Sequence, residues 1–137
     1  MKDQLIASFF AASDMALCPA NAQNLLSQPL PNMAVEAVTS AAMMARGERF
    51  AISRGVAVVP IRGILTPNMF MLERYMGWAT YQGLEDTFGM LAANEEVAAI
   101  VPIFDTPGGM VLGLEGAASA IGAAAKIKPV HALIHPL

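Results

Sequence analysis

The 137-residue chain has the length of one domain, or of a piece of a larger one, and an apolar composition. Hydrophobic residues make up 55% and charged residues 14%, so the chain either packs against partners or lacks sequence that would cover its apolar surface. The net charge is −3 and the eight Lys and Arg are scattered, which argues against nucleic acid as a partner. Cys18 is the single cysteine, which excludes an internal disulfide, and we expect no cofactor and no metal. No apolar run approaches the roughly 18–20 residues that span a bilayer, so no membrane anchor is expected.

Residues 1–48 are predicted to form a helical amino-terminal arm. The opening stretch MKDQLIASFFAASDMAL favours an amphipathic helix, and the alternative, a poor signal peptide, is disfavoured by Asp3 and Asp14. The apolar side of this helix suits packing against a partner, because a membrane-binding helix would carry a basic face. That apolar side consists of Leu5, Ile6, Phe9 and Phe10.

Residues 49–137 alternate strand and helix signals, which predicts an α/β domain with parallel strands and right-handed crossovers. Thr80 is suited to cap a helix whose apolar residues fall at helical spacing. The elements expected along the whole chain are turns at Pro19, Pro29 and Pro31; a helix over Met33–Arg46, capped by Asn32; a short strand over Arg49–Ser53; a buried strand over Gly55–Ile61, closed by Arg62 and Gly63; a loop over Pro67–Gly77; a helix over Tyr81–Ala93; a strand over Val97–Phe104; a helix over about Val111–Ala125; and a strand over Pro129–His135.

The sequence Asp105-Thr106-Pro107-Gly108-Gly109 follows the buried strand and predicts a tight turn before the next helix. Such a turn presents bare backbone N–H groups at the carboxyl end of a strand, where they can face an anion or a developing oxyanion. Gly108 and Gly109 are therefore the candidate site residues. We expect Asp105 to cap the following helix rather than to act as a base.

Four stretches, GVAVVPIRGIL, TYQGLEDTFGMLAANEEVAAIVPIFDTPGG, GLEGAASAI and KPVHALI, together resemble the amino-terminal half of a peptidase family S49 domain. That family includes signal peptide peptidase A and the capsid-assembly proteases of tailed phages. The resemblance runs from about Gly55 to the end, and it implies a ClpP/crotonase-like fold and a serine endopeptidase with a Ser–Lys mechanism. The arm without an anchor resembles the phage branch, whose protease matures the prohead. Pro102 departs from a regular strand, because proline removes a ladder hydrogen bond.

The resemblance implies an oxyanion-hole N–H on Gly109, with Gly108 beside it. In the family, the nucleophilic serine lies on the helix after the strand that matches Pro129–His135, and the lysine base lies further on. Both would fall beyond Leu137, so we expect a truncated fold without the catalytic pair, and whether this chain is itself an enzyme stays open. The implied partners are a polypeptide substrate, further copies of the chain, and capsid or scaffold proteins. The implied location is the cytoplasm of a phage-infected or prophage-bearing bacterium, or the prohead interior.

Other arrangements of reactive residues fit less well. Ser119 and Lys126 share a helix face, but their Cα atoms would lie about 10 Å apart at ~1.5 Å per residue, and Ser53 has no base nearby in sequence. His131 and His135 would lie about 13 Å apart on a strand at ~3.3 Å per residue, which disfavours a metal site. Two other functions stay open: a non-catalytic scaffold module of a capsid-assembly system, and a crotonase-type acyl-CoA protein.

Methionine and aromatic residues are concentrated between the first buried strand and the next helix. Such a cluster is most often core or subunit contact, and in the S49 family this segment lies near the substrate groove, so peptide binding is the alternative. The cluster consists of Met69, Phe70, Met71, Tyr75, Met76 and Trp78.

Overall fold

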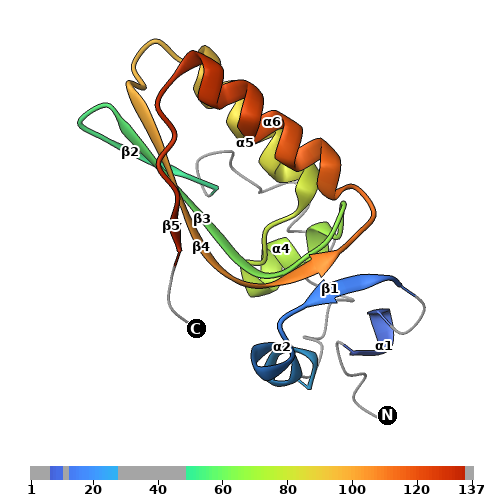
Figure 1. The fold of residues 1–137 in the computed structure, drawn as a ribbon. Coiled ribbons are helices and arrows are strands. Elements are labelled where there is room, and N and C mark those ends of the chain that lie inside the picture. The colour runs from blue at the N-terminus through green and yellow to red at the C-terminus, as the bar shows by residue number, and fades with distance from the viewer. Residues whose placement is uncertain (1–6, 11–12, 28–48, 135–137) are drawn as a thin grey trace.

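The computed structural model describes residues 7–10, 13–27 and 49–134 (Figure 1). These ranges leave out the helix expected over Met33–Arg46 with its cap Asn32, the turns expected at Pro29 and Pro31, and the residues Leu5, Ile6 and His135. Within them, no helix has the length and apolar character needed to cross a membrane. The elements, in chain order, are α1 (Ala7–Phe10), β1 (Met15–Leu17), α2 (Pro19–Leu26), β2 (Ala51–Ser53), β3 (Val56–Leu65), α4 (Phe70–Met76), α5 (Tyr81–Ala93), β4 (Ala99–Met110), α6 (Leu114–Ile127) and β5 (Leu133–Ile134).

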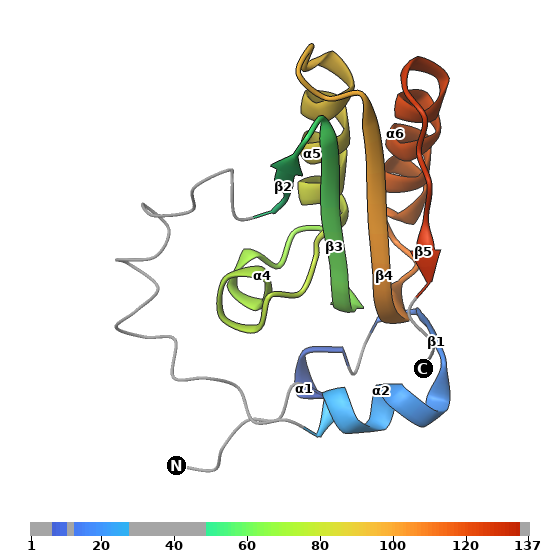
Figure 2. The same ribbon diagram turned by 90° about the vertical axis from the view of Figure 1, so that its left-hand side faces the viewer.

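One mixed sheet organises the described residues, with strand order β1-β4-β3-β2 and with β5 also paired to β4. The parallel pairing expected for the central strands is confirmed, because β4 runs parallel to both β3 and β5. The strands β1 and β2 instead pair antiparallel with β4 and β3. Figure 2 shows β3 and β4 as the long central strands, with the other three strands beside them.

Helices α5 and α6 lie side by side on one face of this sheet (Figures 1 and 2). The core between helices and sheet is built around Phe88 and Leu91 of α5, which are fully buried against Val59 and Ile61 of β3. The helix over Tyr81–Ala93 is confirmed, and so is its cap, because the Thr80 hydroxyl accepts a hydrogen bond from the Gly83 N–H. Side chains of β3 alternate between the two faces of the sheet, and those on one face, Val59 and Ile61, pack against α5.

Lys128 ties the carboxyl ends of the two helices together. It follows α6, and its Nζ donates to the backbone carbonyls of Leu91, at 2.7 Å, and Asn94 at the end of α5. A cation at a helix carboxyl end is favourable because the last carbonyls lack helical partners. The Lys128 side chain thus reaches the carboxyl end of the neighbouring helix α5, although the residue itself follows α6.

Pro102 lies inside β4 and is fully buried. The N–H and C=O of Ile100 both bond to residues 129–131, so alternation along the strand points the Pro102 nitrogen to the same side. There the pairing is interrupted between the Ile100–Val130 bridge and the Ile103–Leu133 pair. The proline thus falls at a break in the ladder. Of the strand expected over Pro129–His135, the described part forms only this bridge and the two-residue β5.

The predicted glycine turn is wrong, because β4 continues through Asp105 to Met110. Likewise, β3 does not end at Arg62 and Gly63 but runs to Leu65. The ladder between β3 and β4 contains an irregularity: Arg62 pairs with Asp105, and Ile64 pairs with Gly108, so β4 carries one extra residue. The helix expected from Val111 begins only at Leu114, after Gly113 in a left-handed conformation.

The amino-terminal arm is not one helix over residues 1–17. Helix α1 ends at Phe10, and Met15–Leu17 form β1, which pairs with Gly108–Met110 of β4. Pro19 does not mark a turn; it begins α2, where its missing N–H costs no helical hydrogen bond. The arm is therefore part of the sheet architecture, with β1 placed between two short helices (Figure 1).

A second apolar cluster connects the arm to the segment that was expected to be a loop. Residues 70–76 form helix α4, and Trp78 just beyond it is buried, as are Phe10, Ile64 and Leu72. The partly buried residues packed against these four are Met15, Leu17, Leu25, Leu26, Met69, Met76 and Met110. Of the methionine and aromatic segment, Trp78 is buried in this cluster and Met69 and Met76 pack against it, whereas Phe70 is 42% exposed.

Tyr81 joins the start of α5 to the end of β4, and this link predicts a pH-dependent stability. Its hydroxyl donates to the Met110 carbonyl at 2.5 Å, and burial raises the pKa of Tyr81. Tyr81→Phe removes the hydrogen bond, so we expect it to lower the free energy of unfolding by about 1 kcal/mol below pH 10. A tyrosine in the unfolded chain ionises at pH ~10, whereas folded Tyr81 stays protonated to higher pH. Above pH ~10 the wild type therefore loses the stability that Tyr81 contributes, and the phenylalanine variant has no such contribution to lose. Urea unfolding from pH 8 to 11 should show the difference shrinking above pH 10; a constant difference would contradict this.

Candidate functional site

The two glycines predicted as site residues lie in β4, between two neighbouring strands. A Cβ added to Gly108 would lie 2.0 Å from the Ala16 carbonyl oxygen of β1. A Cβ added to Gly109 would lie 2.2 Å from the Leu65 carbonyl oxygen of β3. Gly108 also has φ +122°, a conformation that side chains disfavour. The pair therefore allows two strands to approach the same stretch of backbone.

The hydrogen-bond pattern shows where the Gly109 N–H points. Cys18 donates its N–H to the Pro107 carbonyl at 2.7 Å, and Val111 donates to the Asp14 carbonyl at 3.0 Å. Hydrogen-bonded pairs alternate along an antiparallel ladder, so the pair midway between these two, Ala16 and Gly109, is also a bonded pair. The N–H of Gly109 thus faces outward from β3, toward the Ala16 carbonyl of β1.

Thr106 holds the irregular step before the glycines. Its hydroxyl donates to the Gly63 carbonyl at 2.5 Å and accepts from the Gly108 N–H at 3.1 Å. This hydroxyl replaces the backbone partners that the extra residue of β4 displaces. The amides of Gly108 and Gly109 therefore differ: the first bonds within its own strand, and the second faces the strand that lies outside.

The other reactive residues considered from sequence are dispersed over the fold. Asp105 is exposed within β4, where it pairs in register with Arg62, so the prediction that it caps a helix is wrong. Ser53 is exposed in β2, and Ser119 and Lys126 are exposed on α6. His131 is exposed beside the Ile100 bridge. Among residues 7–10, 13–27 and 49–134, no group of three or more His, Cys, Asp or Glu is placed to hold a metal ion.

A pocket of about 220 Å³ lies beside β3, on the side away from β4, and is lined by residues of β3, α4 and α5. It contains neither of the predicted glycines. Its lining residues are Arg49, Val59, Pro60, Arg62, Glu73, Arg74, Gly77, Ala79, Thr80, Gly83, Leu84 and Thr87. β3 therefore separates this pocket from the outer edge of β4 where Gly109 N–H points.

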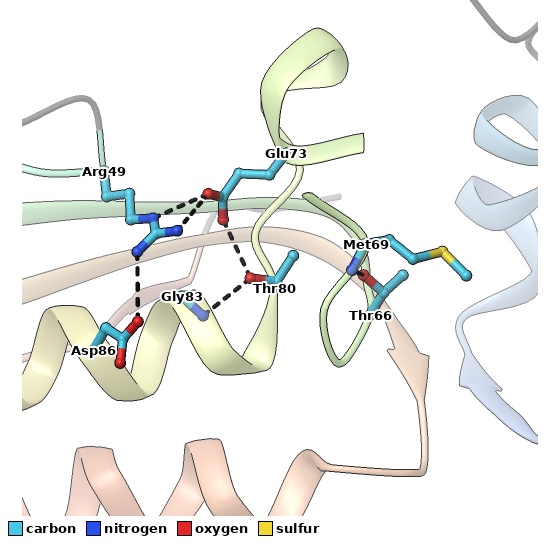
Figure 3. A network of polar contacts seen from close by, with 7 residues as sticks. All are labelled: Arg49, Thr66, Met69, Glu73, Thr80, Gly83 and Asp86. Carbon is cyan, nitrogen blue, oxygen red and sulfur yellow. Dashed lines mark hydrogen bonds and ion pairs between the residues drawn. The ribbon is translucent and has the colours of Figure 1, made fainter. Parts of the chain in front are cut away.

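A polar network closes one wall of the pocket (Figure 3). Both Nε and Nη2 of Arg49 contact one Glu73 carboxylate oxygen, at 3.0 and 2.9 Å. The other Glu73 oxygen accepts from the Thr80 hydroxyl at 3.2 Å. Asp86 lies 3.9 Å from the Arg49 guanidinium but is well exposed, so its contribution is small. The network connects residue 49 to α4 and to the start of α5.

Sequence reasoning found the Thr80 cap but missed this network. Arg49 and Glu73 are 24 positions apart and their pairing leaves no periodic signal in the sequence. It also missed β1, because three residues between short helices give too little alternation to indicate a strand.

The Thr80 hydroxyl, which is fully buried, is expected to stabilise the fold through both of its bonds. Thr80→Val keeps the shape but leaves the buried Gly83 N–H without its acceptor, at a cost of about 1–3 kcal/mol. Thr80→Ser keeps the hydroxyl and removes one methyl group, at a cost of about 0.8 kcal/mol. Urea unfolding of the two variants should rank valine as the less stable; equal losses would show that the hydroxyl contributes little.

Two curated proteins resemble the chain. It is 34% identical over 88 residues to the capsid assembly protease C of Escherichia phage lambda, covering 64% of this chain and 20% of that protein. It is 29% identical over 94 residues to the head-tail preconnector protein GP5 of Enterobacteria phage P21, covering 66% of this chain and 19% of that protein. The chain thus spans about a fifth of the length of these relatives. No family model and no solved structure matches it. The similarity is therefore to two phage proteins, one named a capsid assembly protease and the other a head-tail preconnector protein.

Proposed function

We propose that this chain is part of a serine endopeptidase of the S49 type that acts in phage capsid assembly and prohead maturation. The observation that carries the proposal is the 34% identity to a phage capsid assembly protease over 88 residues. The parallel pairing of β3, β4 and β5, with α5 and α6 packed on one face, is compatible with a ClpP/crotonase-like domain. That fold is part of the proposal.

In this proposal, the Gly109 N–H is the donor that stabilises the oxyanion formed when a peptide carbonyl is attacked. This amide points away from β3 and toward the Ala16 carbonyl of β1, so in the proposed role a substrate carbonyl takes the place of that acceptor. Removing one such donor typically lowers the rate by a factor of about 10²–10³. A serine attacks, and a lysine kept neutral by burial takes its proton. We assign neither role to a serine or lysine of these 137 residues.

The isolated chain is expected to show no peptidase turnover, because the proposed mechanism assigns neither its nucleophile nor its general base to a residue of this chain. Ser53 and Ser119, the serines considered from sequence, are exposed. Incubation with a fluorophosphonate probe should label no serine, and casein should remain intact. A known serine peptidase in the same assay controls for the probe. Labelling of Ser53 or Ser119, or cleavage that the probe inhibits, would contradict this assignment.

A second function, a non-catalytic scaffold or interaction module of a capsid-assembly system, is favoured by exposed apolar side chains. Leu112, Ile127 and Ile134 are 73%, 66% and 72% exposed. Such side chains are typical of surfaces that associate with other proteins when they form contiguous patches. Under this alternative the chain would associate with head proteins and take no part in cleavage.

Co-expression with phage capsid and scaffold proteins tests the capsid-assembly role. We expect the chain to sediment with assembled shells in a sucrose gradient, and to remain at the top when the capsid protein is omitted. Cleavage of the head proteins only when a separately supplied polypeptide carries the serine and the lysine would support the peptidase function. Association without any such cleavage would support the scaffold function, and absence from the shells would contradict both.

A further inference from the structure

The pocket beside β3 is lined by an excess of positive charge. Among the described residues that line it, three are arginines (Arg49, Arg62 and Arg74) and one, Glu73, is acidic. The whole chain has eight Lys and Arg and a net charge of −3, so the pocket has the opposite sign to the chain as a whole. A concave site lined by one sign of charge attracts ions of the other sign. The lining therefore indicates an anion as the ligand.

We propose that this pocket binds a carboxylate on an apolar stem, with Arg62 and Arg74 contacting the carboxylate and with Val59 and Leu84 contacting the stem. A free organic acid supplies such a group, and so does the carboxyl-terminal residue of a polypeptide. β3 separates this pocket from β4 and its Gly109. The site thus goes beyond the peptidase and scaffold functions and depends on neither.

Glu73 does not neutralise the other arginines, because Arg49 and Thr80 already bind its carboxylate. One Glu73 oxygen takes both Arg49 contacts, at 3.0 and 2.9 Å, and the other accepts from the Thr80 hydroxyl at 3.2 Å (Figure 3). The ion pairs found among residues 7–10, 13–27 and 49–134 both involve Arg49. Neither of them includes Arg62 or Asp105, its register partner on β4. The charge of Arg62 is therefore not balanced by an ion pair within these ranges.

The guanidinium of Arg62 lies near the end of α4, beside the pocket. A Cβ added to Gly77, the cap of α4, would lie 3.9 Å from Nη2 of Arg62. Arg74 lies in the last turn of the same helix and also lines the pocket. Arg62 is exposed and Arg74 is half-buried, so a ligand can reach them from solvent. The planar guanidinium fork matches the two oxygens of a carboxylate.

The apolar part of the lining favours a carboxylate on a stem over a bare inorganic anion. Val59 and Leu84 belong to the main core cluster, and 1% and 5% of their surfaces are exposed. Ligand sites combine such apolar walls with a few polar groups that fix orientation. At about 220 Å³ the pocket is smaller than the ~300–1,000 Å³ typical of ligand pockets, so we expect it to hold one small group.

The alternative role of Arg62 needs no ligand. A cation near the carboxyl end of a helix interacts favourably with the helix dipole, so Arg62 would then only stabilise α4. That role predicts a loss of stability on substitution and no binding of carboxylates by the wild type. A binding measurement combined with a stability measurement therefore separates the two roles.

The test measures binding of N-acetyl-leucine to the isotopically labelled full chain by changes in its amide NMR spectrum. We expect shifts at the amides of Gly77, Ala79 and Gly83, which line the pocket, with saturation in the millimolar range. N-acetyl-leucinamide keeps the stem and lacks the charge, and it should bind at least about 10-fold more weakly. Inorganic phosphate keeps the charge and lacks the stem, and it should also bind more weakly than N-acetyl-leucine.

Arg62→Gln should weaken binding of N-acetyl-leucine by about 10-fold. Lys126→Gln is the matched control, because it removes the same charge from an exposed position on α6 outside the pocket lining, and it should bind as the wild type does. Urea unfolding of both variants shows whether Arg62 also affects stability. If Arg62→Gln fails to fold by circular dichroism, Arg74→Gln decides.

A tetrapeptide of three alanines and a carboxyl-terminal leucine identifies the source of the carboxylate. Binding at least about 10-fold tighter than that of N-acetyl-leucine would identify the end of a polypeptide, and equal or weaker binding would identify a free acid. Absence of shifts at the pocket amides, equal binding of the amide or of phosphate, or wild-type binding by folded Arg62→Gln or Arg74→Gln would overturn the proposal. The readout involves neither cleavage nor assembly, so its failure would leave the proposed capsid-assembly role intact.

Discussion

The structure depends on how closely β1 and β3 approach one stretch of β4. Two adjacent glycines make this possible, because a side chain on Gly108 would meet the backbone of β1 and a side chain on Gly109 would meet the backbone of β3. Strand pairing on both sides satisfies the backbone of this stretch, so it extends as a strand instead of turning. The arm, the sheet and the second apolar cluster are thereby joined at one place.

Elements with strong local signals could be predicted from the sequence. The bounds of α5 follow from Thr80 as a cap and from apolar side chains at helical spacing, and both operate within a few residues. The glycine stretch could not be predicted in this way. Adjacent glycines after a strand favour a turn on local grounds, and what overrides that preference is pairing with Ala16, some ninety positions away. Contacts between such distant residues leave no periodic pattern in either segment.

The same distinction between local signals and contacts of distant residues applies to the candidate site. The sequence predicts Gly109 as an oxyanion-hole donor, and the structure directs its amide away from β3 and toward the Ala16 carbonyl of β1. The direction comes from the extra residue in β4 between Arg62–Asp105 and Ile64–Gly108, which reverses the side to which alternate amides point. The sequence of β4 alone predicts neither the extra residue nor the hydrogen bonds of the Thr106 hydroxyl that support it.

An amide can stabilise a developing oxyanion only if its hydrogen is not already committed to another acceptor. Here the carbonyl of Ala16 lies opposite the Gly109 N–H, so a reacting carbonyl and the amino-terminal strand would need the same donor. A peptide carbonyl on an added strand is also the group that such a donor would recognise in a substrate. Under the proposed function, the internal strand therefore occupies the place that a substrate carbonyl would take.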